Sequence, residues 1–130
     1  DAQGERISIA LRRLRLGVHG GAESWNHEAS LVVLDRREAV VGYIAVAEAS
    51  DNSVIAGLAV EAAHRRRGLA RLLVVRSMNV CLRQGCTTMS AAVTTRNPAR
   101  DLLTSLGFRA AECGKVAIWW RDGRHQAWLE

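Results

Sequence analysis

The sequence predicts a single α/β domain built on one mixed β-sheet, and three observations predict this class. Three short apolar runs between residues 29 and 60 are separated by turn residues, which is typical of an antiparallel meander. From residue 68 the apolar spacing becomes helical. A strand, a second helix and two more strands follow, up to residue 121. Strands followed by alternating helices and strands indicate an α/β domain with a mixed sheet.

The N-terminal half is expected to contain one helix and three strands. Residues 5–17 combine apolar side chains with arginines and end at Gly17, which predicts a helix. The polar, glycine-rich residues 18–28 predict a loop. The three strands are expected over residues 29–35, 39–48 and 54–60.

The C-terminal half is expected to contain two helices and three strands. A helix is predicted over residues 68–84, with Gly85 as its C-terminal stop. Its apolar face is expected to comprise Leu69, Leu72, Leu73 and Val80, with Arg76 as a polar interruption. Asn97 as cap and Pro98 at the first helical position predict a second helix that ends at Gly107. The apolar side of that helix is expected to comprise Ala99, Leu102, Leu103 and Leu106, and the strands to cover residues 87–93, 108–112 and 116–121.

Length and composition predict one soluble globular domain over residues 1–130. The apolar fraction is 48% and the charged fraction is 24%, as in ordinary globular proteins. No apolar run approaches the ~20 residues that span a bilayer, and no secretory leader opens the chain, so we expect a cytoplasmic protein without membrane contact. The chain starts at Asp1, so the sequence leaves open whether it belongs to a longer protein. Its three cysteines lack paired spacing, which predicts reduced thiols and no metal site.

The positive charge of the chain has one focus. The net charge is +5, and His64-Arg65-Arg66-Arg67 is followed closely by Arg71 and Arg76. Aromatic residues are few and do not alternate with basic ones, so a base-stacking nucleic-acid surface is not indicated. We therefore expect a small anionic ligand and no nucleic acid.

The stretch from Leu58 to Val74 places this charge between a strand and a helix. The strand-like run ends at Val60, a basic loop follows, and the helix begins near Gly68. Unpaired N–H groups and a partial positive charge at a helix start form an anion site. Gly68 allows a phosphate to approach the backbone, and Ala70 keeps the first turn narrow. The pattern is neither a Walker A loop nor a G-x-G-x-x-G loop.

Two motifs in this chain resemble those of one enzyme superfamily. Arg65-x-x-Gly68-x-Ala70 after a strand resembles motif A of the GNAT N-acetyltransferases, Q/R-x-x-G-x-G/A. About thirty residues on, Asn97-Pro98-Ala99-Arg100 leads to Leu106-Gly107-Phe108, and a helix of this kind is common in the same superfamily. The two motifs occur in the expected order and spacing within residues 29–121.

The resemblance implies a fold and an acetyl-coenzyme A site. The fourth and fifth strands would splay apart, with the pantetheine arm between them and the pyrophosphate on the N–H groups of residues 66–71. Asn97 would contact the cofactor, cap the helix, or do both, and Arg100 would reach a phosphate. The implied cofactor-binding residues are Leu58, Ala59, Val60, Arg65, Arg66, Arg67, Gly68, Leu69, Ala70, Arg71, Asn97 and Arg100.

The implied reaction is direct attack of a primary amine on the thioester, and it needs a neutral amine. At pH 7 a lysine-like amine with a pKa near ~10.4 spends about 4.6 kcal/mol to lose its proton. The Val60 N–H would stabilise the oxyanion, and Glu61 is the preferred base. Two proton-transfer positions depart from the superfamily pattern, because the usual tyrosine is Leu103 and the usual glutamate is Val54. Tyr43, the only tyrosine, is expected in the core.

Several features of the acceptor side stay open at this stage. His64 is expected to contact the cofactor or to be exposed. Trp25 either lines the acceptor pocket or caps the core, while of Trp119 and Trp120 one is expected to point inward. The superfamily's first strand is expected to be missing or abbreviated, which makes a homodimer plausible. The alternative function is a catalytically weak acyl-CoA-binding module that senses the cofactor and regulates a partner.

Overall fold

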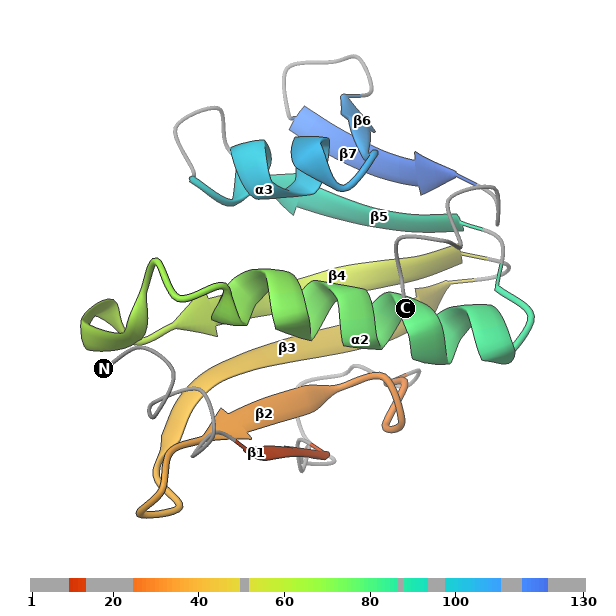
Figure 1. The fold of residues 1–130 in the computed structure, drawn as a ribbon. Coiled ribbons are helices and arrows are strands. Elements are labelled where there is room, and N and C mark those ends of the chain that lie inside the picture. Colours follow the sequence, from red (N-terminus) through yellow and green to blue (C-terminus); the bar gives the residue numbers. More distant parts are fainter. Residues whose placement is uncertain are drawn as a thin grey trace.

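The structure is a computed structural model that describes residues 10–13, 25–49, 52–86, 88–93, 98–110 and 116–121. Its elements, in chain order, are β1 (Ala10–Arg13), β2 (Leu31–Leu34), β3 (Val40–Ala49), β4 (Asn52–Val60), the 3-10 turn η1 (Ala62–His64), α2 (Leu69–Arg83), β5 (Thr88–Val93), α3 (Ala99–Ser105), β6 (Arg109–Ala110) and β7 (Val116–Arg121). Figure 1 shows α2 lying along β3 and β4, with α3 on the side of the sheet that holds β5 and β7.

The described strands form one mixed sheet, as the sequence predicts. Their order is β1-β2-β3-β4-β5-β7-β6. All neighbours are antiparallel except β4 and β5, which are parallel and joined through α2. Parallel neighbours require such a crossover, and the crossover helix covers one face of the sheet. The α/β fold class with a mixed, mostly antiparallel sheet is confirmed.

The predicted N-terminal helix over residues 5–17 is wrong where the structure describes it. Residues 10–13 form strand β1, with Ala10 opposite Leu34 and Arg13 opposite Leu31 on β2. The segment reads Ala-Leu-Arg-Arg without alternation, and pairing with β2 outweighs the helical preference of leucine and arginine. A short strand ahead of β2 is therefore present. The rest of this prediction, and most of the predicted loop over 18–28, lie outside the described residues.

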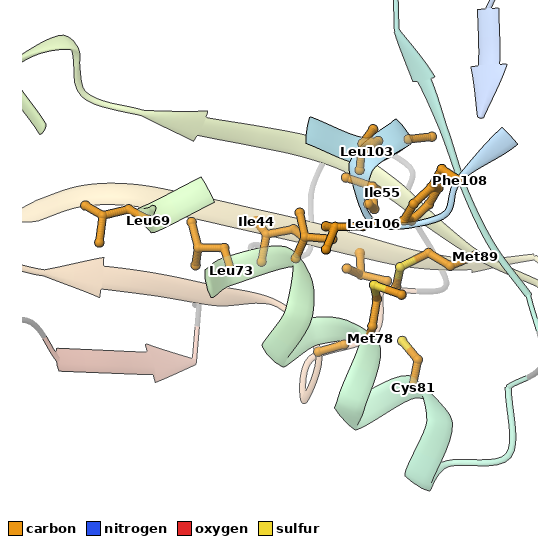
Figure 2. Packing of buried hydrophobic residues seen from close by; sticks show 14 of the residues in the cluster. Ile44, Ile55, Leu69, Leu73, Met78, Cys81, Met89, Leu103, Leu106 and Phe108 are labelled. Carbon is orange, nitrogen blue, oxygen red and sulfur yellow. The ribbon is translucent and has the colours of Figure 1, made fainter. Parts of the chain in front are cut away.

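The core lies between α2, α3 and the sheet, and Figure 2 shows its central side chains. The buried residues of α2 are Leu69, Leu73, Val74, Ser77, Met78 and Cys81. Leu72 and Val80, predicted on this face, are half-buried, and Arg76 is exposed. The predicted stripe is therefore rotated, because the true face uses small and sulfur-containing residues that a count of leucines and valines misses.

Both predicted helix ends are confirmed, and each has the same physical cause. Gly85 and Gly107 have φ angles of 89° and 98°, a left-handed conformation that glycine adopts without strain. The N–H after each glycine then donates back into the helix, from Cys86 to the Cys81 carbonyl and from Phe108 to the Leu103 carbonyl, at 3.0 Å in both cases. Pro98 occupies the N-cap of α3 rather than its first position. Asn97, the predicted cap, lies outside the described residues.

Among the described residues no helix is long and apolar enough to cross a membrane. The same part of the chain contains no cluster of three or more His, Cys, Asp or Glu side chains that could hold a metal ion.

Ser77 and Ser30 give a matched test of buried hydroxyl groups. Both side chains are fully buried, but Ser77 Oγ has no hydrogen-bond partner within the described structure. Ser30 Oγ donates to the Asn26 carbonyl at 2.7 Å and accepts from the Val46 N–H at 2.9 Å. We expect Ser77→Ala to raise the free energy of unfolding by about 1 kcal/mol, because it removes an unsatisfied buried group.

Ser30→Ala is the control, and it should lower the free energy of unfolding by about 1–3 kcal/mol because it orphans the Val46 N–H. Urea unfolding of the two variants and the parent measures both values. Equal losses in the two variants would contradict the assignment of Ser77 as unsatisfied.

Candidate functional site

Strand β4 loses its β5 neighbour halfway along its length. The β4–β5 pairing runs from Asn52 opposite Thr88 to Ile55 opposite Ala91. The β3–β4 pairing continues to Val60. Beyond Ile55, β4 therefore has one paired edge and one edge without a described strand neighbour.

A β-bulge lies where the two strands part. Ala45 pairs with Gly57 and Val46 with Ile55, so Ala56 is an extra residue on β4. A bulge bends its strand and strengthens the local twist. It therefore gives a physical reason for β4 to turn away from β5 at this point.

The backbone groups of β4 after the bulge point alternately to its two edges. The Glu61 N–H donates to the Val41 carbonyl on β3 at 2.8 Å. Because successive residues of a strand alternate their N–H and C=O directions, the groups of Ala59 also point to β3. Those of Leu58 and Val60 point to the open edge. Of the three residues expected to bind through their backbone, two therefore present it and Ala59 does not.

The loop after β4 ends in an uncapped helix start. Gly68, the N-cap of α2, has a left-handed backbone with φ 78°, and no side chain caps the helix. A Cβ placed on Gly68 would meet no heavy atom within 4 Å, so the space in front of it is open. The first helical bond runs from the Leu72 N–H to the Gly68 carbonyl at 2.9 Å. The N–H groups of residues 69–71 therefore have no acceptor within the helix.

A pocket of about 320 Å³ opens at this helix start. Its volume is in the range of small-molecule sites. Its walls come from the end of β4, the loop, the first turn of α2, and α3. The lining residues are Val60, His64, Arg65, Arg66, Gly68, Leu69, Ala70, Arg71 and Leu102. Residues 65–68 are exposed, so packed side chains do not seal the bend.

Two arginine side chains give the pocket positive charge and also form hydrogen bonds that join the elements around it. Arg65 Nε donates to the Val60 carbonyl at 3.0 Å, which ties the loop to the end of β4. Arg71 Nη1 donates to Ser105 Oγ at 3.3 Å, which ties α2 to α3. Arg67 and Arg100 do not line the pocket; Arg67 is exposed and Arg100 is half-buried on α3.

Glu61 and His64 form a pair at the edge of the pocket. His64 Nδ1 lies 3.0 Å from Glu61 Oε1. The His64 side chain is 22% exposed and the Glu61 side chain 55% exposed. If the Nδ1 proton is donated to the carboxylate, Nε2 is left as a proton acceptor. Since His64 lines the pocket and Glu61 does not, the histidine links the carboxylate to it.

The two positions that depart from the superfamily pattern, Leu103 and Val54, hold apolar residues that are buried or half-buried. Leu103 is 1% exposed and belongs to the core with Phe108. Val54 is half-buried and lies between Ala47 and Ser90 on the neighbouring strands. Neither position can transfer a proton.

The prediction that Tyr43 belongs to the core is wrong. Tyr43 is 36% exposed, and its ring crosses from β3 to lie over Gly57. A Cβ at Gly57 would come within 3.0 Å of Tyr43 Cε2, so the glycine makes room for the ring on the sheet surface.

The structure describes the surroundings of Trp25 but not the side-chain directions of the other two tryptophans for which a prediction is made. Trp25 is half-buried and forms a β-bridge with Ala47. Ala47 pairs with Val54, toward the opposite end of β4 from Val60, so Trp25 does not line the pocket at α2. Strand β7 covers residues 116–121 as predicted. The side-chain directions of Trp119 and Trp120 lie outside what the structure describes.

Sequence reasoning missed two parts of the site. Leu102 packs against the core, as the sequence predicts, but it also forms a pocket wall, which the sequence does not indicate. The bulge at Ala56 was not predicted, although the small residues Ala56-Gly57 within a β-branched run are a recognised signal for one.

An open strand edge beside an uncapped helix start characterises an α/β domain whose free backbone groups can bind an elongated anionic ligand. The sequence model of the "Acetyltransferase (GNAT) family" matches residues 11–108 of this chain. The chain belongs to this family, whose cosubstrate is acetyl-coenzyme A.

Three solved structures illustrate the same fold at low sequence identity. The PaiA N-acetyltransferase of Thermoplasma acidophilum, in complex with coenzyme A, has a TM-score of 0.65 and 10% identity over 71% of this chain and 59% of its own. The ribosomal-protein-S18-alanine N-acetyltransferase of Escherichia coli has a TM-score of 0.69 and 16% identity, covering 85% of this chain and 90% of its own. Arabidopsis thaliana Naa50, in complex with the bisubstrate analogue CoA-Ac-MVNAL, has a TM-score of 0.70 and 16% identity, covering 87% and 98%. A search of curated protein sequences found no significant match.

Arg66 and Arg67 allow a test of backbone strain in the loop. Arg66 has φ 66°, a left-handed conformation that is unfavourable for any residue but glycine, whereas Arg67 has no positive φ. Arg66→Gly should leave the free energy of unfolding unchanged or raise it. Arg67→Gly should lower it by about 0.5–1 kcal/mol or more, because it adds freedom to the unfolded chain and removes the interactions of the Arg67 side chain. Urea unfolding compares the two variants, and a larger loss for Arg66→Gly would show that this loop is not strained.

Proposed function

We propose that the chain transfers the acetyl group of acetyl-coenzyme A to a primary amine. The observation that carries the proposal is the uncapped start of α2, which opens on an arginine-lined pocket beside the free edge of β4. A long ligand with a diphosphate at one end fits this arrangement better than a compact anion. Coenzyme A, the ligand named for the PaiA structure, is such a molecule.

The first turn of α2 is assigned to the pyrophosphate. The N–H groups of Leu69, Ala70 and Arg71 lack helical acceptors, and the helix start carries a partial positive charge. Arg65, Arg66 and Arg71 line the same pocket and add full charges. The missing Cβ at Gly68 leaves space for phosphate oxygens. Arg100, two residues before the lining residue Leu102, remains assigned to a peripheral phosphate.

The open edge of β4 is assigned to the pantetheine arm. Leu58 and Val60 direct their N–H and C=O groups to this edge, whereas Ala59 directs its groups to β3. The Val60 carbonyl already accepts from Arg65 Nε, so the proposal uses both backbone groups of Leu58 and the N–H of Val60, and drops Ala59. The arm would act as a replacement strand for the part of β4 that β5 does not cover.

The residues at the end of β4 are assigned to the chemistry. Bound acetyl-coenzyme A supplies a thioester carbonyl that an amine can attack. The Val60 N–H points to the open edge, where it can donate to the oxygen that gains negative charge. Glu61 takes up the amine proton directly or through His64, whose ring it holds at 3.0 Å. With Leu103 in the acid position, the departing thiolate would take its proton from solvent.

A second candidate function is supported by the two apolar positions that depart from the superfamily pattern, Val54 and Leu103. Because Leu103 is in the core and Val54 is between strands, the chain could bind acyl-coenzyme A and sense it without efficient transfer. Amine-dependent release of free thiol separates the two functions. Thiol release supports the enzyme, whereas a cofactor-induced rise in melting temperature without thiol release supports the sensor.

Cofactor binding is tested with two glycine variants of equal strain. Gly68 and Gly85 are left-handed, with φ 78° and 89°, and both face open space. Gly68→Ala and Gly85→Ala should each cost about 1–2 kcal/mol of unfolding free energy. Acetyl-coenzyme A at 100 times its Kd should stabilise the parent by about 2.7 kcal/mol. We expect Gly85→Ala to keep this thermal shift and Gly68→Ala to lose most of it.

If both variants keep the shift, the pyrophosphate is not bound at the start of α2. If the parent shows no shift at millimolar acetyl-coenzyme A, the proposed function itself fails.

Glu61→Gln tests the proposed base. It should lower kcat/KM for the amine about 100-fold, the usual contribution of one general base, and leave the acetyl-coenzyme A shift unchanged. Glu38→Gln, an exposed carboxylate in the β2–β3 turn, is the control and should not alter either value. A Glu61→Gln enzyme with parental kcat/KM would remove Glu61 from the mechanism.

A further inference from the structure

Tyr43 lies on the face of the sheet that α2 does not cover. A Cβ at Gly42 would lie 3.5 Å from Leu73 Cδ1 and 3.3 Å from Val60 Cγ2, so position 42 faces α2. Side chains alternate along a strand, so Tyr43 faces the other way. Its neighbours there are Ala59, its register partner on β4, and Gly57.

This arrangement places one large ring among very small side chains. The ring leans along β4 from Ala59 to Gly57, where Cε2 and the hydroxyl oxygen lie 3.0 Å and 3.1 Å from the position of an added Cβ. Ala56, the bulge residue, follows and is exposed. A tyrosine of which 36% is exposed next to three residues without a large side chain forms a flat aromatic surface rather than part of the core.

The ring also lies close to the gap between β4 and β5, where a ligand can pass from one face of the sheet to the other. The anion pocket lies at the start of α2 and includes Val60, whose side chain is on the α2 face. Pairing between β4 and β5 stops at Ile55, directly before the bulge. The free edge of β4 therefore leads from Val60, where the thioester is proposed to lie, toward Gly57 and the Tyr43 ring.

We propose that Tyr43 is an acceptor-binding residue whose ring supports the amine substrate on the face opposite α2. This inference rests on the proposed function. An ammonium group beside the ring can lie against its negative face, and an aliphatic or peptide chain can cover its edge. The acceptor class is thus an amine on an aliphatic or peptide carrier without an acidic group beside it.

The test uses steady-state kinetics with two acceptors. One is a trialanine amide with a free N-terminus, and the other is an Nα-acetyl-lysine methylamide with a free ε-amine. The one that the parent protein acetylates with the higher kcat/KM is then used for the variants. Tyr43→Ala should raise the KM of that amine roughly tenfold, as for a lost contact with a cation. Tyr43→Phe keeps the ring and should stay within about twofold. Neither variant should alter the thermal shift by acetyl-coenzyme A.

Two further variants separate binding from folding. Gly57→Ala keeps the tyrosine but displaces its ring, so it should also raise the amine KM. Val40→Ala, on the same strand and 55% exposed, should leave the KM unchanged.

Parental KM values in Tyr43→Ala and Gly57→Ala would overturn this inference alone, because the parent would still transfer acetyl groups. A Tyr43→Phe loss as large as that of Tyr43→Ala would overturn the role of the ring. No thiol release by the parent with either amine would overturn the proposed transfer reaction, and this inference with it.

Discussion

The site depends on one interruption in a hydrogen-bond ladder. Strand β4 pairs with β3 to its end but with β5 only to Ile55, and the bulge at Ala56 lies at the point of separation. A regular ladder to Val60 would use the same backbone groups to close the sheet. The interruption leaves peptide groups of Leu58 and Val60 without a strand neighbour in the described structure. Apart from the Val60 carbonyl, which accepts from Arg65 Nε, these groups form a preorganised surface to which an extended ligand could bind.

The helix start that follows is held in place by the core rather than by its own loop. Arg66 and Gly68 are both left-handed, and non-glycine residues in that region cost about 1 kcal/mol or more. The next residue, Leu69, is buried, and Leu73 and Met78 continue the same buried face of α2. Packing of this face against the sheet gives far more free energy than the loop costs. The first turn can therefore keep its N–H groups without partners.

Sequence patterns predicted the parts of the molecule that local chemistry controls. Gly85 and Gly107 end their helices because the left-handed conformation suits glycine, and the strand before Val60 and the basic loop follow from β-branched and charged runs. The failures involve partners that are distant in sequence. Strand β1 exists because β2 lies beside it, and Tyr43 is on the surface because Gly57, on another strand, leaves space for its ring. The direction of Ala59 required the register of β3 and β4, which no single-sequence pattern contains.

In the proposed reaction the two faces of the sheet would recognise their ligands by different means, which is compatible with a fold shared at 10–16% identity. On the α2 face the contacts assigned to the cofactor are mostly N–H groups, which every residue except proline provides. Side chains there can change as long as the bulge, the left-handed glycine and the buried stripe of α2 remain. On the other face the surface is formed by side chains, and in this chain by a tyrosine above a glycine. If the proposed roles hold, changes on that face would alter which amine is accepted without disturbing the backbone assigned to the cofactor, so acceptor choice could diverge while the fold and the cofactor are retained.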